Sequence, residues 1–166
     1  MPITSISDNC WQNILNVQAQ AYTDVLPEAL NVLKSKWLAS PEMCFVFKNS
    51  KNETVGYLLA HSWNSDVPPK LFQELPSDAA GDILYLHDLA VSDHIRGQGV
   101  ASQLFNKLLE SAKTHGYKRI LLVAVQKSES YWFKHGFREV PNAIVCRSYG
   151  EEALLMCCDV SINNIP

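Results

Sequence analysis

Six residues near the middle of the chain indicate its fold: Arg96-Gly97-Gln98-Gly99-Val100-Ala101. They follow an apolar run over residues 83–91 that predicts a strand, and they precede an amphipathic stretch that predicts a helix closed by Gly116. The two glycines permit a tight turn, and the helix start offers unpaired N–H groups and the positive end of the helix dipole. With the guanidinium of Arg96 alongside, the turn predicts a binding site for a phosphate group.

Two other glycine-rich phosphate motifs do not match this stretch. The dinucleotide fingerprint requires Gly or Ala where the chain has Ser102, and it follows the first strand of its unit, whereas three strands are expected before this turn. The P-loop requires Gly-Lys-Ser or Gly-Lys-Thr, which does not follow here. From these residues alone, a turn that binds nothing stays the alternative to a phosphate site.

Hydrophobic periodicity predicts the elements on both sides of the turn. Besides the central helix, helices are expected from a cap at Ser7-Asp8, from Pro27 to Pro41, and over residues 128–135. Apolar stripes are expected at Trp11, Ile14, Leu15 and Val17 in the first helix and at Leu30, Val32, Leu33 and Leu38 in the second. Strands are expected over residues 43–48, 54–62, 83–91 and 120–125, from Phe137, and over 153–160. This order indicates one mixed α/β domain over residues 1–166.

Composition and charge exclude several classes of protein. The chain has 166 residues, 47% hydrophobic and 19% charged, which is typical of one globular domain. Its 14 Lys and Arg against 17 Asp and Glu argue against a nucleic-acid binder, which needs a basic face. The longest apolar runs, residues 120–125 and 153–158, are too short for a membrane span. No basic residue precedes Lys34, so we expect no signal peptide and a cytoplasmic location.

The cysteines show no pattern of a metal site or a disulfide framework. They are scattered and odd in number: Cys10, Cys44, Cys146, Cys157 and Cys158. We expect reduced, buried side chains and no bound metal. The adjacent pair at 157 and 158 lies in an expected strand and so should point to opposite faces.

Three segments together resemble the GNAT superfamily of acyl-CoA-dependent N-acetyltransferases. The family's phosphate motif is matched by Arg96, Gly99 and Ala101. Residues 86–91, Leu-His-Asp-Leu-Ala-Val, resemble its fourth strand, and residues 130–137, Ser-Tyr-Trp-Phe-Lys-His-Gly-Phe, resemble its helix ending in Gly-Phe. The resemblance covers essentially the whole chain. It implies the GNAT fold, a central mixed sheet of six to seven strands flanked by about four helices.

The resemblance also implies acetyl-CoA as co-substrate. Its pyrophosphate would lie on backbone N–H groups of the glycine-rich turn, and its pantetheine arm would pair with the fourth strand like an added strand. The following strand would part from the fourth and leave a V-shaped opening. The implied cofactor-binding residues are Leu89, Ala90, Val91, Arg96, Gly97, Gln98, Gly99, Val100, Ala101, Ser102, Ser128 and Trp132.

The implied reaction is direct attack of a primary amine on the acetyl group in a ternary complex, which needs a base. Strand alternation predicts Tyr85, His87 and Leu89 on one face and Leu86, Asp88 and Ala90 on the other. We expect His87 to be the base, because imidazole titrates at about pH 6.5. The arylalkylamine N-acetyltransferases, a branch of the superfamily, resemble this chain in having a histidine here. The alternatives are a structural His87, whose ring is satisfied by a neighbour, and Asp88 as the base.

Two sources are open for the proton that the leaving thiolate needs. The family's usual acid is a tyrosine four residues before the glycine of the Gly-Phe pair, and this chain has Trp132 there with Tyr131 one residue earlier. Either Tyr131 reaches the sulfur or solvent protonates the thiolate. Because Trp132 replaces the usual tyrosine, a second function is also considered, that of a non-catalytic acyl-CoA-binding regulatory module.

The acceptor is expected to be a small-molecule amine, a peptide N-terminus or a lysine. The polar connection over residues 64–82 is negatively charged, with Lys70 against four acidic residues, Asp66, Glu74, Asp78 and Asp82. If this segment covers the acceptor site, its negative charge would favour cationic amines. We further expect that an exposed last strand could pair between two copies in a homodimer.

Overall fold

The computed structural model describes residues 2–23 and 26–161. Within these residues lie one seven-stranded sheet and four α-helices, as expected. The strands are β1 (Ile3–Ser5), β2 (Phe45–Lys48), β3 (Thr54–Trp63), β4 (Ile83–Val91), β5 (Arg119–Ala124), β6 (Arg138–Glu139) and β7 (Leu154–Asp159). The helices are α1 (Trp11–Ala21), α2 (Leu30–Ala39), α3 (Val100–Thr114) and α4 (Glu129–Lys134). None of the described helices combines the length and apolar character that crossing a membrane requires.

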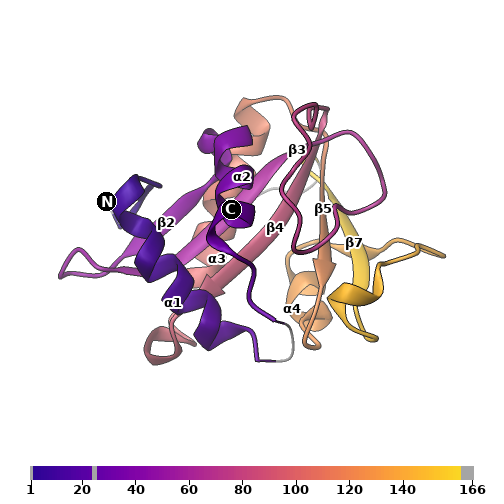
Figure 1. The fold of residues 1–166 in the computed structure, drawn as a ribbon. Coiled ribbons are helices and arrows are strands. Elements are labelled where there is room, and N and C mark those ends of the chain that lie inside the picture. Colours follow the sequence, from indigo (N-terminus) through magenta and orange to yellow (C-terminus); the bar gives the residue numbers. More distant parts are fainter. Residues whose placement is uncertain (1, 24–25, 162–166) are drawn as a thin grey trace.

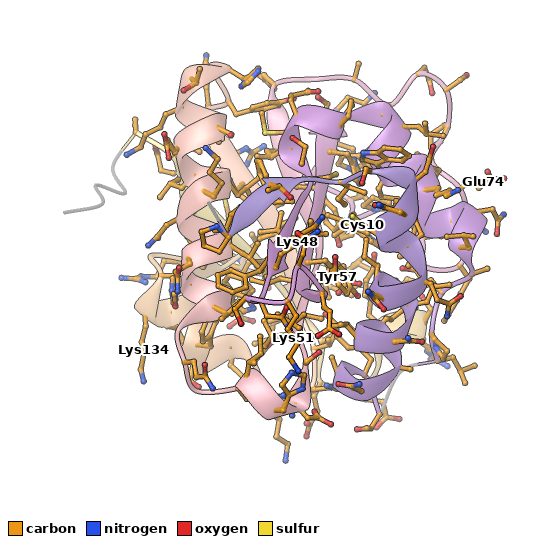
Figure 2. All side chains as sticks on the ribbon, turned by 90° about the vertical axis from the view of Figure 1, so that its left-hand side faces the viewer. Cys10, Lys48, Lys51, Tyr57, Glu74 and Lys134 are labelled. Carbon is orange, nitrogen blue, oxygen red and sulfur yellow. The ribbon has the colours of Figure 1, made fainter. Side chains whose placement is uncertain are left out.

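Helices cover both faces of the sheet. Figure 1 shows α1 and α2 in front of it, and Figure 2, turned by 90°, shows the sheet between them and α3. The apolar face predicted for α3 is buried against the sheet, with Leu104 and Phe105 in the larger core. On the other face, Trp11 and Ile14 of α1 pack with Tyr57 of β3 in a second core. The two cores fix the strands that carry the site.

The strand order is β1-β2-β3-β4-β5-β7-β6, and only β4 and β5 pair in parallel. Their pairing ends early, because Ile83, Leu84 and Tyr85 pair with Arg119, Ile120 and Leu121 and no later residues pair. From Leu86 onward the two strands part. The V-shaped opening expected beside β4 is confirmed.

A β-bulge at His87 makes the predicted alternation along β4 wrong. Leu59 of β3 pairs with Asp88 and Ala60 pairs with Leu86, so His87 is the extra residue. The faces therefore exchange after the bulge. Leu86 and Leu89 belong to the α3 side, and Ala90 belongs to the α1 side. His87 and Asp88 both contact groups on the side of α1 and α2.

The N-terminal third differs from prediction at several boundaries. A strand that was not predicted, β1, pairs with β2. The Ser7 side chain bonds Asn9 and does not cap a helix. The second helix begins at Leu30 and not at Pro27. The side-chain amide of Gln18 bonds both the backbone N–H and the backbone carbonyl of Glu28, and this keeps the chain extended before Leu30. Leu30 and Leu38, predicted to face the core, are 37% and 70% exposed.

The last strand is covered along only part of its outer edge. β6 lies beside β7, with Arg138 opposite Cys157 and Glu139 opposite Met156. Pairing of the rest of this edge with a second copy stays a prediction. Cys158 lies in the α3-side core and Cys157 packs on the other face, as predicted. Cys146 is exposed, contrary to the expectation of burial.

The buried His61 predicts how stability depends on pH. Its side chain is fully buried on β3, and burial lowers its pKa from 6.5 to about 3, although its Nδ1 bonds the carbonyl of Ser62. Between these values the unfolded chain binds a proton that the folded chain does not, so stability falls as pH falls. From pH 7 to pH 5 this histidine alone costs about 2 kcal/mol.

We therefore expect His61→Asn, which does not titrate, to lose less stability than the wild type between pH 7 and pH 5. Urea unfolding at the two pH values measures this difference. Equal losses in both proteins would show that the ring is protonated without penalty in the fold.

Candidate active site

A groove of about 370 Å³ follows the open side of β4. Of the residues predicted to bind cofactor or act in catalysis, it is lined by His87, Leu89, Ala90, Val91, Arg96, Ala101, Ser128, Tyr131 and Trp132. The structure thus brings strand, turn and α4 together around one space. Gly97, Gln98, Gly99, Val100 and Ser102 do not line the groove but form the turn and the first residues of α3 beside it.

The glycine-rich turn combines two positive φ angles with a helix start that has unpaired N–H groups. Gly97 and Gly99 have φ angles of 81° and 79°, and a Cβ added at either would have no atom within 4 Å. In α3 the N–H of Gln103 bonds the carbonyl of Gly99 at 3.1 Å, so the N–H groups of the preceding first turn have no intrahelical partner. The N–H of Gln98 reaches the carbonyl of Ile95 at 3.4 Å. These features fit an anion at the positive end of α3.

A smaller cavity of about 60 Å³ lies on the other side of the opening. It shares walls with the groove at Tyr22, His87, Asp88, Val123 and Val125. Its remaining walls are Gln18, Leu26, Glu28, Leu71 and Tyr149. The groove and this cavity therefore meet where β4 and β5 part.

His87 is held by Glu28 at this junction. Its Nε2 lies 2.5 Å from Oε1 of Glu28, and the two side chains are 1% and 7% exposed. The N–H of Phe72 donates to the other carboxylate oxygen at 2.9 Å. Burial alone would raise the pKa of Glu28, but the hydrogen bond and charge of His87, with smaller contributions from Phe72 and Lys36, lower it overall. Nδ1 of His87 is buried and has no hydrogen-bond partner among the described residues.

Asp88, the alternative base, has both carboxylate oxygens occupied. Tyr57 donates its O–H to Oδ2 at 2.5 Å, and Tyr22 donates to Oδ1. Burial raises the pKa of Asp88, although His87 and the two hydroxyls oppose this effect. Figure 2 shows Tyr57 in the interior, beside the sheet. The contacts indicate that Asp88 anchors Tyr22 at the junction.

Tyr131 faces the groove, while Trp132 belongs mainly to the core. The Tyr131 hydroxyl lies 3.1 Å from Oγ of Ser102, which also lies 3.1 Å from Nε2 of His135. Burial raises the pKa of Tyr131, so its hydroxyl keeps its proton near neutral pH. Trp132 is 8% exposed and packs edge-on against Phe105 and Phe137.

Tyr22, Glu28 and Tyr149 were missed by the sequence reasoning. Each enters the site from a segment without a recognisable motif, so no local signal could have identified them. The polar connection over residues 64–82 does not place its charges at the site as expected. It lines the small cavity through Leu71, and none of its four carboxylates lines the groove or the small cavity. Asp66 instead pairs with Arg119. Across residues 2–23 and 26–161, no three His, Cys, Asp or Glu side chains gather as metal ligands would.

Comparison with known proteins identifies a family and a fold. The family model described as "Acetyltransferase (GNAT) family" matches residues 11–137. Curated protein sequences gave no significant match.

Three solved structures are similar at low identity. The GNAT-like decarboxylase GphF, solved with isobutyryl-CoA, has a TM-score of 0.79 at 14% identity and covers 96% of this chain and 100% of its own. Ard1 from Thermoplasma volcanium has a TM-score of 0.72 at 15% identity and covers 95% of each chain. The NatC complex bound to Gag peptide and CoA has a TM-score of 0.71 at 17% identity, and the match covers 96% of this chain and 99% of that chain. At such identities these structures establish the fold.

Proposed function

The chain belongs to the GNAT family of acetyltransferases, and from that membership we propose that it transfers an acetyl group from acetyl-CoA to a small primary amine. One observation carries the proposal. The groove beside the phosphate turn and the small cavity meet where β4 and β5 part, and His87 and Tyr22 line both. Two substrates bound from opposite sides would meet at that point.

The groove supplies the groups that a CoA thioester needs. The turn at Gly97 and Gly99 with the N-terminus of α3 would hold the pyrophosphate, and Arg96 adds a cation. The unpaired side of β4 from Leu89 to Val91 would accept the amides of the pantetheine arm. Bound there, acetyl-CoA would supply the activated acetyl group.

The small cavity favours a slim cationic acceptor. A cavity of about 60 Å³ is well below the roughly 150 Å³ that holds a benzene ring, so it admits the end of a narrow chain and not a ring. Leu71, Val123 and Val125 give it apolar walls, while Glu28 and Asp88 add carboxylates. An amine on an unbranched carbon chain, free or as a lysine side chain, matches both features.

The junction also offers groups for proton transfer. His87 would take the proton from the ammonium, and Tyr131 on the groove side would give one to the leaving thiolate. Since Asp88 is held by two tyrosine hydroxyls, we assign it to positioning Tyr22.

Release of free thiol from acetyl-CoA tests the proposal. We expect unbranched aliphatic amines to be acetylated at least about tenfold faster than amines of equal pKa that are branched beside the nitrogen. One extra methylene misplaced in a tight pocket costs about 1–3 kcal/mol.

One other function has an observation in its favour. Trp132 occupies the family's usual tyrosine position and packs in the core, as a non-catalytic acyl-CoA-binding module would allow. No thiol release with any amine, together with calorimetric binding of CoA, would favour that module.

A further inference from the structure

We propose that Glu28 is a positioning residue that fixes the tautomer of His87, keeping the Nδ1 lone pair free as the base. The role in catalysis rests on the proposed acetyl transfer, whereas the tautomer itself can be tested without any substrate. Glu28 precedes α2 in a segment with no motif, and only the fold brings it to His87.

Glu28 is held more firmly than most surface carboxylates. Its side chain is 7% exposed, and the N–H of Phe72 donates to Oε2 at 2.9 Å. Its backbone is fixed as well, because the Gln18 amide accepts from its N–H at 3.0 Å and donates to its carbonyl at 3.2 Å. A residue held once at its carboxylate and twice at its backbone can keep an imidazole in one orientation.

The hydrogen bond determines which ring nitrogen carries the proton. An ionised carboxylate only accepts, so Nε2 of His87 must be the donor across the 2.5 Å contact with Oε1. A neutral imidazole has a single N–H, so its other nitrogen, Nδ1, keeps the lone pair.

In the neutral ring, no described residue donates a hydrogen bond to that lone pair. Nδ1 is buried and has no partner in the described part of the chain, and a buried acceptor without a donor costs about 1–3 kcal/mol. Less than 1 Å² of Nδ1 is accessible, but His87 lines both cavities, and an amine N–H that reached Nδ1 from the junction would supply the missing donor. The arrangement leaves one unsatisfied acceptor at the place where a proton must be removed.

Several charged or titratable groups surround the pair. They are Tyr22, directly after α1, Lys36 of α2, Tyr57 and His61 of β3, Tyr85 and Asp88 of β4, and Tyr149. Burial keeps His61 neutral in the folded protein near pH 7. None of these groups bonds the His87 ring, whose hydrogen-bond partner among the described residues is Glu28.

Glu28→Gln tests the tautomer directly. A glutamine that still accepts from Phe72 presents its NH₂ group to Nε2, which forces the His87 proton onto Nδ1. Nitrogen-15 NMR of the substrate-free protein distinguishes the two tautomers, with the His87 signals identified by their absence in His87→Ala. We expect the Nε2–H form in the wild type and the Nδ1–H form in Glu28→Gln. A wild-type proton on Nδ1 would overturn the proposal.

Kinetics test the consequence. We expect Glu28→Gln to lower kcat by about 10²–10⁴-fold, with KM for acetyl-CoA nearly unchanged, because the proton then blocks the base. Glu28→Asp should recover part of the loss. The matched control is Glu74→Gln, since Glu74 is exposed at the rim of the molecule in Figure 2 and lines neither the groove nor the small cavity.

Failure of the positioning role of Glu28 and failure of the proposed acetyl transfer give different results. A Glu28→Gln protein as active as the wild type, with the same pH profile, would overturn the positioning role. A wild type inactive toward every amine would instead contradict the proposed function, and the NMR experiment would still decide the tautomer.

Discussion

Replacing His87 with alanine is expected to lower turnover at pH 7 by about 10²–10⁴-fold, the usual contribution of a positioned general base. The loss should shrink as pH rises, because the acceptor amine then deprotonates in solution. The pH dependence of kcat/KM measures this, and an unaltered profile in the variant would remove His87 from the mechanism.

The variant needs two checks, because His87 is also part of the interior. Alanine leaves the Glu28 carboxylate buried without its partner, so some loss of stability is expected. Binding of CoA by calorimetry shows whether the folded variant keeps its groove. His115→Ala is the matched control, since His115 is an exposed histidine at the far end of α3 and lines neither the groove nor the small cavity.

Arg96→Glu is expected to weaken CoA binding by about 10- to 100-fold. A charge-assisted hydrogen bond contributes about 1.5–3 kcal/mol, and the substitution also places a negative charge beside the pyrophosphate. Arg96 is exposed at the rim of the groove, where Asp93 binds it at 3.0 Å, so salt should reduce the difference.

Calorimetry at low and at moderate salt measures this effect. The control is Lys51→Glu, the same change of charge at the exposed turn between β2 and β3, on a residue that lines neither the groove nor the small cavity. Equal affinity in wild type and Arg96→Glu would contradict the location of the pyrophosphate.

The central part of the fold could be predicted from the sequence. Residues 83–91 form a strand and α3 begins directly after Gly99, because glycines at positive φ and a regular apolar stripe are local signals. The groove side of the site follows from the same signals. Arg96, Ala101 and Tyr131 line it as expected.

The acceptor side could not be predicted, for two physical reasons. The bulge at His87 depends on how β3 pairs with β4, and a period of two along one strand cannot reveal an extra residue. Glu28 reaches His87 across 59 positions because Gln18 and Phe72 hold it there. Such contacts exist only in the folded chain.

The short pairing of β4 with β5 also has a mechanical meaning. The sheet consists of two parts, β1–β4 and β5–β7, whose described strands pair with each other only between Ile83–Tyr85 and Arg119–Leu121, with one further backbone hydrogen bond from the N–H of Lys118 to the carbonyl of Asp82. Rotation about this narrow hinge would change the width of the opening without breaking any other strand pairing. The α3-side core includes Leu86 of one part and Leu122 of the other, so such a rotation would disturb its packing and be resisted by it. The two parts of the sheet are thus joined by a short paired segment, and the proposed reaction site lies where they separate.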